Sequence, residues 1–299
     1  MGLMFTKKCL ICKAGTKNDC LYWHKNPDSD EIWVWCQGRC QRGYSLLEYC
    51  NQANIDLASF LKQDFDFIES KPNEVRAMAW PSSFIPLSDP RAQPGVDYLK
   101  GVRKLHLEGD MYYDMDRNGI VFPYYFGNHF CGAQIRLIIP KDLGDGEFQK
   151  MDTIPGTRLG LLFGLWNQSR FVTNIKVVGI CEGYFNALSL QQAFNRKYGG
   201  IANNPWKFVC TSGSGISEHQ KETIKELKEQ GIKTIAAMDT DLAGLKGLKK
   251  LTESGAISHY AITGDTEKDW NDKLKELSHE ELAMFFLKNI HKIDRKSVV

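Results

Sequence analysis

The chain has 299 residues, of which 42% are hydrophobic and 25% are charged. This composition is typical of a globular protein of one to three domains, and it excludes a fibrous or wholly disordered chain. The net charge is only +2, because 38 basic side chains nearly cancel 36 acidic ones, so composition alone does not indicate a nucleic-acid-binding protein.

The cysteines and the apolar runs bear on where the protein works. No apolar run approaches the roughly 20 residues that span a bilayer, and residues 1–8 lack the apolar stretch of a secretory signal. We therefore expect a cytoplasmic protein with no membrane partner. The cytoplasm keeps thiols reduced, so close pairs among the nine cysteines indicate metal binding rather than disulfides.

Residues 1–60 are expected to form a small zinc-binding ribbon. Two close pairs of cysteines lie in this segment, namely Cys9 with Cys12 and Cys36 with Cys40. Each pair can turn the chain back on one metal ion while the residues between the pairs form a hairpin, so four thiolates can hold one structural zinc in a tetrahedron. The metal would contribute much of the folding free energy, because so small a module has little core. Helical apolar spacing across residues 44–49 predicts a helix after the second pair.

Alternatives remain for the details of this module. Cys20 and His24 form a further pair at a spacing of four residues and can replace one ligand, so the fourth ligand is left open. Four reduced core cysteines are a weaker interpretation, because the two pairs are so closely spaced. Trp33 and Trp35 lie among basic residues, a mixture expected of a surface that stacks unpaired bases. At least half of the aromatic residues in so small a domain should instead pack in its core.

The next segments predict a linker and then a strand-rich subdomain. Five prolines between residues 71 and 95 indicate that residues 61–95 link two domains. In residues 96–175, short β-forming runs at 119–126 and 133–139 are separated by turn residues, which predicts an antiparallel subdomain.

From residue 176 onward, apolar strands alternate with helical patterns. This alternation predicts a mainly parallel sheet with crossover helices over residues 176–272, followed by a helical tail at 273–299. The predicted strands are 176–181, 207–210, 234–238 and 258–262, and the predicted helices begin at Tyr184, Ser217 and Ala243. The expected fold class is therefore α/β, with a strand-rich α+β subdomain and a zinc ribbon before it.

Acidic residues lie at or just after the ends of three predicted parallel strands. Glu182 follows the first strand, Asp239 and Asp241 follow the third, and Asp269 follows the fourth. Because ligands in open α/β sheets bind at this edge, we expect these carboxylates to form one site. Asp239 and Asp241 are one residue apart, so both can face the same hard divalent cation. Glycines at positions 183 and 244 fit tight turns beside the site.

In this order, the acidic clusters resemble the motifs of the TOPRIM domain, which DnaG-type primases, topoisomerases and some nucleases share. Residues 178–188 resemble the first motif, with Glu182 at its glutamate, and residues 239–244 resemble the paired-aspartate motif. Residues 268–272 resemble the late acidic motif of the primase branch. Residues 211–217 resemble the primases' loop between these motifs, where backbone amides such as that of Gly213 can meet a phosphate.

One position departs from the resemblance. Many relatives have an aspartate where this chain has Asn186, four residues after the glutamate. An asparagine supplies no negative charge, but its carbonyl can still accept a hydrogen bond or coordinate a metal. We therefore expect altered metal affinity rather than lost activity.

The order of the modules resembles bacterial and bacteriophage primases, in which a zinc ribbon precedes a strand-rich basic subdomain and a TOPRIM domain. Residues 120–123, 132–136 and 162–166 resemble segments that precede TOPRIM in these primases. The resemblance implies that Arg136 faces nucleotide or template phosphates, with Lys141 and Arg158 as further candidates. Each of these cations can equally be an exposed, solubilising charge.

The resemblance implies a DNA primase, which makes short RNA primers on single-stranded DNA by divalent-metal-dependent nucleotidyl transfer. Asp239, Asp241 and Asp269 would hold magnesium or manganese, and Glu182 would be a further ligand or a general base. The expected partners are single-stranded DNA, nucleoside triphosphates and a replicative helicase, in the cytoplasm of a bacterium or a phage-infected cell. Two alternatives stay open: a TOPRIM nuclease or topoisomerase fragment, and a noncatalytic single-stranded-DNA-binding replisome adaptor.

The cysteine spacing leads to the first prediction. The purified protein should contain about one tightly bound zinc ion per chain, because four thiolates at this spacing form one closed structural site. Metal analysis of the wild type and of Cys36→Ser checks this. Absence of zinc, or an unchanged zinc content in the variant, would remove the zinc ribbon from the architecture.

Overall fold

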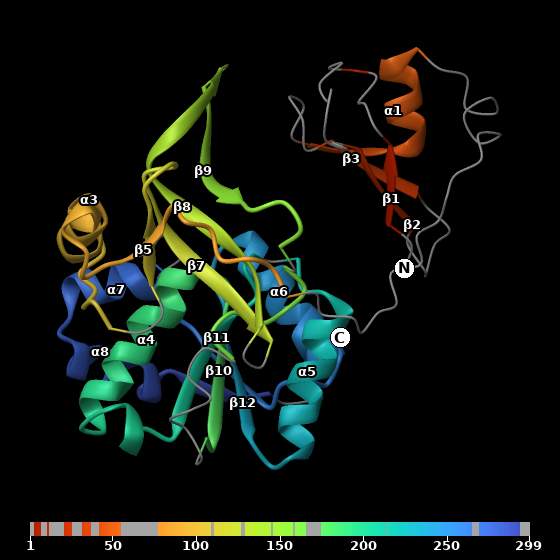
Figure 1. The fold of residues 1–299 in the computed structure, drawn as a ribbon. Helices are drawn as coiled ribbons and strands as arrows, with labels where there is room; N and C mark the ends of the chain where they lie inside the picture. Colours follow the sequence, from red (N-terminus) through yellow and green to blue (C-terminus); the bar gives the residue numbers. More distant parts are fainter. Residues whose placement is uncertain are drawn as a thin grey trace. The chain divides into compact units, whose positions relative to one another are not determined.

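The protein, described by a computed structural model, divides into two compact units, residues 1–75 and 76–299 (Figure 1). The described residues are 3–6, 11, 21–25, 32–36, 42–54, 77–108, 111–126, 129–144, 146–157, 159–165, 175–213, 215–264 and 269–293. Within these ranges, no helix is both long and apolar enough to cross a membrane.

Within its described residues, the first unit contains a four-stranded antiparallel sheet followed by helix α1. The elements are β1 (Leu3–Thr6), β2 (Leu21–Lys25), β3 (Ile32–Cys36), β4 (Arg42–Ser45) and α1 (Leu46–Ala53), and the strands pair in chain order. The β2–β3 pair confirms the hairpin expected between the two cysteine pairs. Helix α1 begins where the Ser45 hydroxyl accepts a hydrogen bond from the Glu48 amide. Val34 and Tyr49 are fully buried, so this unit has apolar contacts of its own.

An antiparallel sheet forms the first part of the second unit. Its strands are β5 (Phe84–Pro86), β6 (Tyr112–Asp114), β7 (Gly119–Phe126), β8 (His129–Gly144) and β9 (Glu147–Thr153), paired in chain order. Three short helical segments lie between β5 and β6: η1 (Pro90–Ala92), α3 (Gln93–Asp97) and η2 (Tyr98–Val102). Val121, Ile135 and Phe84 belong to an apolar core on one face of this sheet. The predicted strand-rich subdomain is confirmed.

The stretch predicted as a linker is partly structured. Residues 77–95 contain β5, η1 and the start of α3, and they belong to the second unit. The interpretation of this proline-containing stretch as a linker is therefore wrong for its second half. Pro86 lies in an edge strand, while Pro90 and Pro94 lie in the first turns of helical segments, and proline is tolerated in both places.

A mainly parallel sheet forms the rest of the second unit, as predicted. Its strands are β10 (Val177–Cys181), β11 (Trp206–Cys210), β12 (Lys233–Ala237), β13 (His259–Ala261) and β14 (Ile290–Lys292). Its helices are α4 (Tyr184–Lys197), α5 (Glu218–Glu229), α6 (Leu242–Glu253), α7 (Trp270–Glu276) and α8 (His279–Lys288). The strand order is β11-β10-β12-β13-β14, and all neighbours are parallel except β13 and β14.

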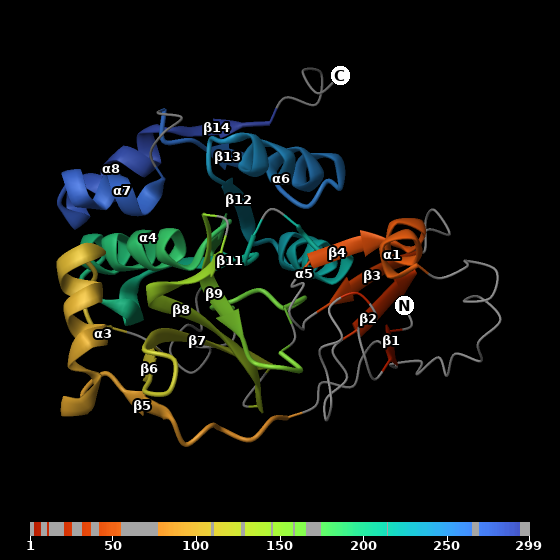
Figure 2. The same ribbon diagram turned by 90° about the horizontal axis from the view of Figure 1, so that it is seen from above.

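Helices cover both faces of this sheet. Figures 1 and 2 show α4, α7 and α8 on one face and α5 and α6 on the other. Aliphatic residues such as Ile180, Ile224 and Leu251 pack on the α5 and α6 face. On the α4 face, the Phe194 ring packs against the Trp206 and Phe286 rings. Two-sided burial explains why these strands are apolar runs rather than alternating patterns.

The chain after residue 272 differs in part from the predicted helical tail. Helix α8 forms as expected, but residues 290–292 then form β14, which pairs antiparallel with β13. Three residues carry too little periodic pattern to identify a strand, and this one is stabilised by hydrogen bonds to a partner about 30 residues earlier in the chain.

The position of β5 leads to a prediction about fragments. A fragment of residues 77–299 should fold, whereas a fragment of residues 96–299 should unfold at a lower temperature. The shorter fragment lacks Phe84, Ile85 and Ala92, which are at most 6% exposed, so their loss leaves apolar surface and a cavity. We expect the unfolding midpoint to fall by at least about 5 °C, measured by circular dichroism. Equal midpoints would contradict the assignment of β5 to this unit.

Candidate active site

Two acidic residues follow neighbouring strands at the point where the strand order reverses. Glu182 comes directly after β10, and Asp239 comes two residues after the end of β12. The chain leaves β10 toward β11 on one side, whereas β12 pairs with β10 on the other. Open α/β sheets bind ligands at the carboxyl ends of strands beside such a switch point. Both residues therefore lie where this fold places its binding sites.

Two further aspartates begin helices at the same edge. The Asp241 carboxylate accepts a hydrogen bond from the Gly244 amide (2.8 Å) at the start of α6. The Asp269 carboxylate accepts one from the Asp272 amide (2.8 Å) at the start of α7. The partial positive charge of a helix N-terminus stabilises a carboxylate in this position. Each cap occupies one carboxylate oxygen, so the second oxygen is not needed for the cap.

The two glycines beside the site differ in what they do. A Cβ atom at Gly244 would lie 2.0 Å from the Asp239 carbonyl oxygen, so only glycine lets α6 start this close to Asp239. Gly183 has extended backbone (φ −112°), and a Cβ there would come no nearer than 4.0 Å to another residue. A tight turn that requires glycine is therefore found at Gly244, whereas the surroundings of Gly183 leave room for a side chain.

Electrostatic coupling joins the four acidic residues into one carboxylate cluster, consisting of Glu182, Asp239, Asp241 and Asp269. Burial is the largest of the causes that together raise the pKa of Asp239 from 3.8 to about 7. The charges of Asp269, Glu182 and Asp241 are the next causes, in that order of importance, whereas the hydrogen bond from Asn186 lowers this pKa. Burial also raises the pKa values of Glu182 and Asp269. The cluster thus holds more negative charge than its surroundings neutralise.

This excess of negative charge suits a hard divalent cation. The Oε2 atom of Glu182 is buried and has no hydrogen-bond partner among the described residues. The four members of the cluster offer carboxylate oxygens, the type of ligand that magnesium and manganese prefer. Within the described part of the chain, no three histidine, cysteine, aspartate or glutamate side chains already form a ligand set. Magnesium commonly binds through only one or two carboxylates, with waters and phosphate oxygens completing its shell.

The predicted phosphate-binding residues lie in three different settings. Arg136 lies on β8 opposite Ile120, and its Nε atom is buried without a hydrogen-bond partner among the residues described. Lys141 is exposed on the β8–β9 hairpin. Gly213 has φ 132°, and its amide donates to the Glu182 carbonyl oxygen (3.1 Å), so this amide already has a partner. Arg158 lies outside the described residues.

Little of the predicted zinc site falls within the described residues. Cys36 lies at the end of β3 and is buried. Trp33 and Trp35 are in the same strand, and their side chains are outside the described part. Cys9, Cys12 and Cys40 also lie outside it, so zinc binding stays a prediction.

A buried polar bridge, which the sequence analysis missed, links the antiparallel sheet to the carboxylate cluster. The hydroxyl of Tyr184, two residues after Glu182, bonds to the Tyr124 hydroxyl and to the Gln134 side chain. Tyr124 also bonds to Ser212, in the loop after β11. Burial raises the pKa values of both tyrosines, so they remain neutral hydrogen-bonding groups. Gln134 is two residues before Arg136, so both lie on the same face of β8.

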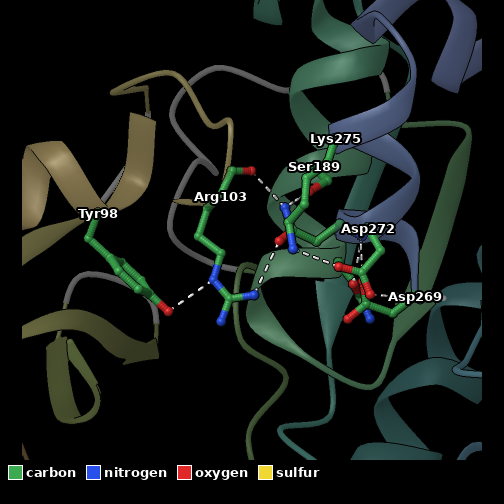
Figure 3. Close-up of polar contacts among 8 residues, drawn as sticks. Tyr98, Arg103, Ser189, Asp269, Asp272 and Lys275 are labelled. Atoms are coloured by element: carbon green, nitrogen blue, oxygen red, sulfur yellow. Dashed lines mark hydrogen bonds and ion pairs between the residues drawn. The ribbon is translucent and has the colours of Figure 1, made fainter. Parts of the chain in front are cut away.

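A second missed network holds the start of α7 (Figure 3). The Arg103 side chain donates to Tyr98 Oη (2.9 Å) and to Asn271 Oδ1 (3.3 Å). Asn271 Nδ2 in turn donates to the Arg103 carbonyl oxygen and to Ser189 Oγ, both at 2.9 Å. The Arg103 guanidinium also lies 4.2 Å from the centre of the Phe185 ring. No local sequence pattern reveals Arg103, because its partner Asn271 lies 168 residues later.

Comparison with known families identifies the region that carries this site. Residues 179–274 match the family described as Toprim-like. This part of the chain is a Toprim-like domain. It contains all four members of the carboxylate cluster, so the predicted TOPRIM domain is confirmed. No curated protein sequence matches the chain.

The solved structures to which the chain is similar include three primase structures. A DnaG primase catalytic domain bound to single-stranded DNA is 16% identical with a TM-score of 0.49, over 70% of this chain and 75% of that one. The zinc-binding and RNA polymerase domains of Aquifex aeolicus primase are 18% identical with a TM-score of 0.44, over 93% and 81%. The primase fragment of the bacteriophage T7 primase-helicase protein is 15% identical with a TM-score of 0.46, over 95% and 99%.

The raised pKa of Asp239 in the Toprim-like domain predicts a pH dependence. A carboxyl group whose folded pKa exceeds its ordinary value favours the folded state most when protonated. The metal-free protein should therefore lose stability as the pH rises from about 4 to about 7. Asp239→Asn should flatten this decline, measured as the thermal unfolding midpoint in a metal chelator. The control Glu226→Gln, at an exposed position on α5, should keep the decline. A decline of the same slope in Asp239→Asn would contradict the assignment.

Proposed function

We propose that this protein is a DNA primase, which synthesises short RNA primers on single-stranded DNA by divalent-metal-dependent nucleotidyl transfer. The observation that carries the proposal is the carboxylate cluster at the switch point of a Toprim-like domain. There the Asp239 pKa is raised to about 7, and a buried Glu182 oxygen lacks a hydrogen-bond partner among the described residues. Such a site gains most from a cation, which polyphosphate chemistry requires.

The members of the cluster would divide the work of one transfer step. Asp239, Asp241 and Asp269 would hold magnesium or manganese, and the bound ion would supply stabilisation of negative charge on the reacting oxygens. Glu182 is a further ligand, or a general base that accepts the proton of the primer 3′-hydroxyl. As that hydroxyl attacks the α-phosphate of a nucleoside triphosphate, a phosphodiester bond forms and pyrophosphate leaves.

The face of β8 that carries Gln134 and Arg136 is the proposed place for nucleotide or template phosphates. Phe122, opposite Gln134 on the neighbouring strand, stacks on the Tyr184 ring (4.2 Å between centroids), so this face lies against the start of α4. Arg136 on this face has an unpaired buried Nε atom among the residues described, and guanidinium groups pair readily with phosphate oxygens. Lys141, Arg158 and the loop at Gly213 are further proposed contacts.

The first unit would hold the template and help to start new chains. We assign it one zinc ion bound by Cys9, Cys12, Cys36 and Cys40, with Trp33 and Trp35 as proposed base-stacking residues. The expected partners are single-stranded DNA, nucleoside triphosphates and a replicative helicase, in the cytoplasm of a bacterial or phage-infected cell. Among the residues described, no helix is suited to span a membrane.

Loss of the carboxylates should abolish primer synthesis. Glu182→Ala, and separately Asp239→Ala with Asp241→Ala, remove charge that positions the cation and the triphosphate, so synthesis should fall at least about 100-fold. Incorporation of labelled ribonucleotides on random single-stranded DNA measures this. Glu226→Ala, an exposed change on α5, is the matched control and should keep wild-type activity.

The same assay separates the competing functions. Near-normal synthesis by either carboxylate variant would show that the chemistry lies elsewhere. Cleavage of DNA with magnesium in the absence of triphosphates would instead indicate a TOPRIM nuclease. DNA binding with neither reaction would indicate a replisome adaptor.

A further inference from the structure

Asn186 connects two parts of the carboxylate cluster. Its Nδ2 atom donates a hydrogen bond to Asp239 Oδ1 (2.7 Å), and its Oδ1 atom accepts one from the backbone N–H of Asn271 (3.0 Å). The side chain is buried, with 2% of its surface exposed. Asn271 belongs to α7, which Asp269 begins. One amide side chain thus links Asp239 after β12 to the helix that carries Asp269.

Further hydrogen bonds hold Asn271 and the start of α7 in place. Its side chain is held by Arg103 and by Ser189 on α4. The start of α7 is further closed by a capping box, in which Asp269 and Asp272 each bond to the other's backbone amide. Figure 3 shows Arg103 between Tyr98 and this end of α7. The position of Asn186 is therefore determined by contacts outside the cluster, and Asp239 is oriented by Asn186.

The direction of these hydrogen bonds requires an amide. Asn186 donates on one side and accepts on the other, which asparagine can do and an ionised carboxylate cannot. An aspartate at this position would place a second anion within hydrogen-bonding distance of Asp239. Two carboxylates this close repel each other unless a proton or a cation lies between them.

We propose that Asn186 is a positioning residue that assembles the carboxylate cluster without help from a metal ion. The amide holds Asp239 and α7 in place in the metal-free protein, and it leaves the cluster one negative charge smaller than an aspartate would. An aspartate at position 186 makes the assembled site depend on a divalent cation. The inference rests on the proposed cation-binding function of the cluster.

Thermal unfolding of the full chain tests this, in a metal chelator and in magnesium. Asn186→Asp should lower the unfolding midpoint by roughly 4 to 8 °C in chelator, and magnesium should restore most of the loss. The matched control is Asn195→Asp, also buried on α4. Asn195 Oδ1 only accepts hydrogen bonds, from Gln191 and Asn204, as an aspartate can. This control should show no magnesium-dependent recovery beyond that of the wild type.

A double variant that exchanges the two side chains distinguishes loss of this hydrogen bond from a general failure to fold. In Asn186→Asp with Asp239→Asn, donor and acceptor change places, so the hydrogen bond re-forms and the cluster keeps its original charge. This double variant should regain the metal-free midpoint of the wild type to within about 2 °C. The inference is overturned if the exchange restores nothing. It is also overturned if Asn186→Asp unfolds like the wild type in chelator, or if magnesium raises its midpoint no more than that of Asn195→Asp.

These outcomes do not depend on primer synthesis. If the wild type makes no primers but the midpoints behave as stated, the role of Asn186 stands and the primase function fails. If the wild type makes primers but magnesium does not rescue Asn186→Asp, the primase function stands and the role of Asn186 fails.

Discussion

Carboxylates at one edge of a parallel sheet repel one another, and this repulsion constrains how the rest of the site is built. Asp239 is flanked by three other acidic residues, and burial with their charges raises its pKa to about 7. The fold offsets this repulsion locally. Asp241 and Asp269 lie at helix N-termini, where backbone amides stabilise their charge, and Asp239 accepts a hydrogen bond from a neutral amide. The same excess of negative charge makes the site receptive to a divalent cation.

The antiparallel sheet is bound to this edge by both apolar and polar contacts. Phe122 stacks on Tyr184, and the hydroxyl groups of Tyr184, Tyr124 and Ser212 form a buried bridge two residues from Glu182. Burying several hydroxyl groups is tolerable only when each is satisfied, and such a network specifies one arrangement of the two sheets. The strand that carries Arg136 is therefore placed with respect to the cluster by the core, and not by a flexible connection.

Much of the architecture could be predicted from local pattern. The alternation of apolar runs with helical patterns identified the parallel strands and their crossover helices. Glu182 and Asp239 were identified by their position just after the ends of two of these strands. These features are local, because periodicity and chain direction alone determine which residues end a strand. The prolines at 86, 90 and 94 led to the wrong prediction of a linker, because an edge strand and a first helical turn accept proline as readily as a linker does.

Periodicity and chain direction were enough to predict the class of fold and the acidic residues that follow the strand ends. The side chains that support those acidic residues are brought to them only by the folded chain. Asn186 meets Asp239 across 53 residues, and Asn271 meets Arg103 across 168. Strand β14 likewise depends on pairing with β13. A hydrogen bond needs two groups at the right distance and with opposite roles, and neither condition is visible in a sequence until the chain has brought them together.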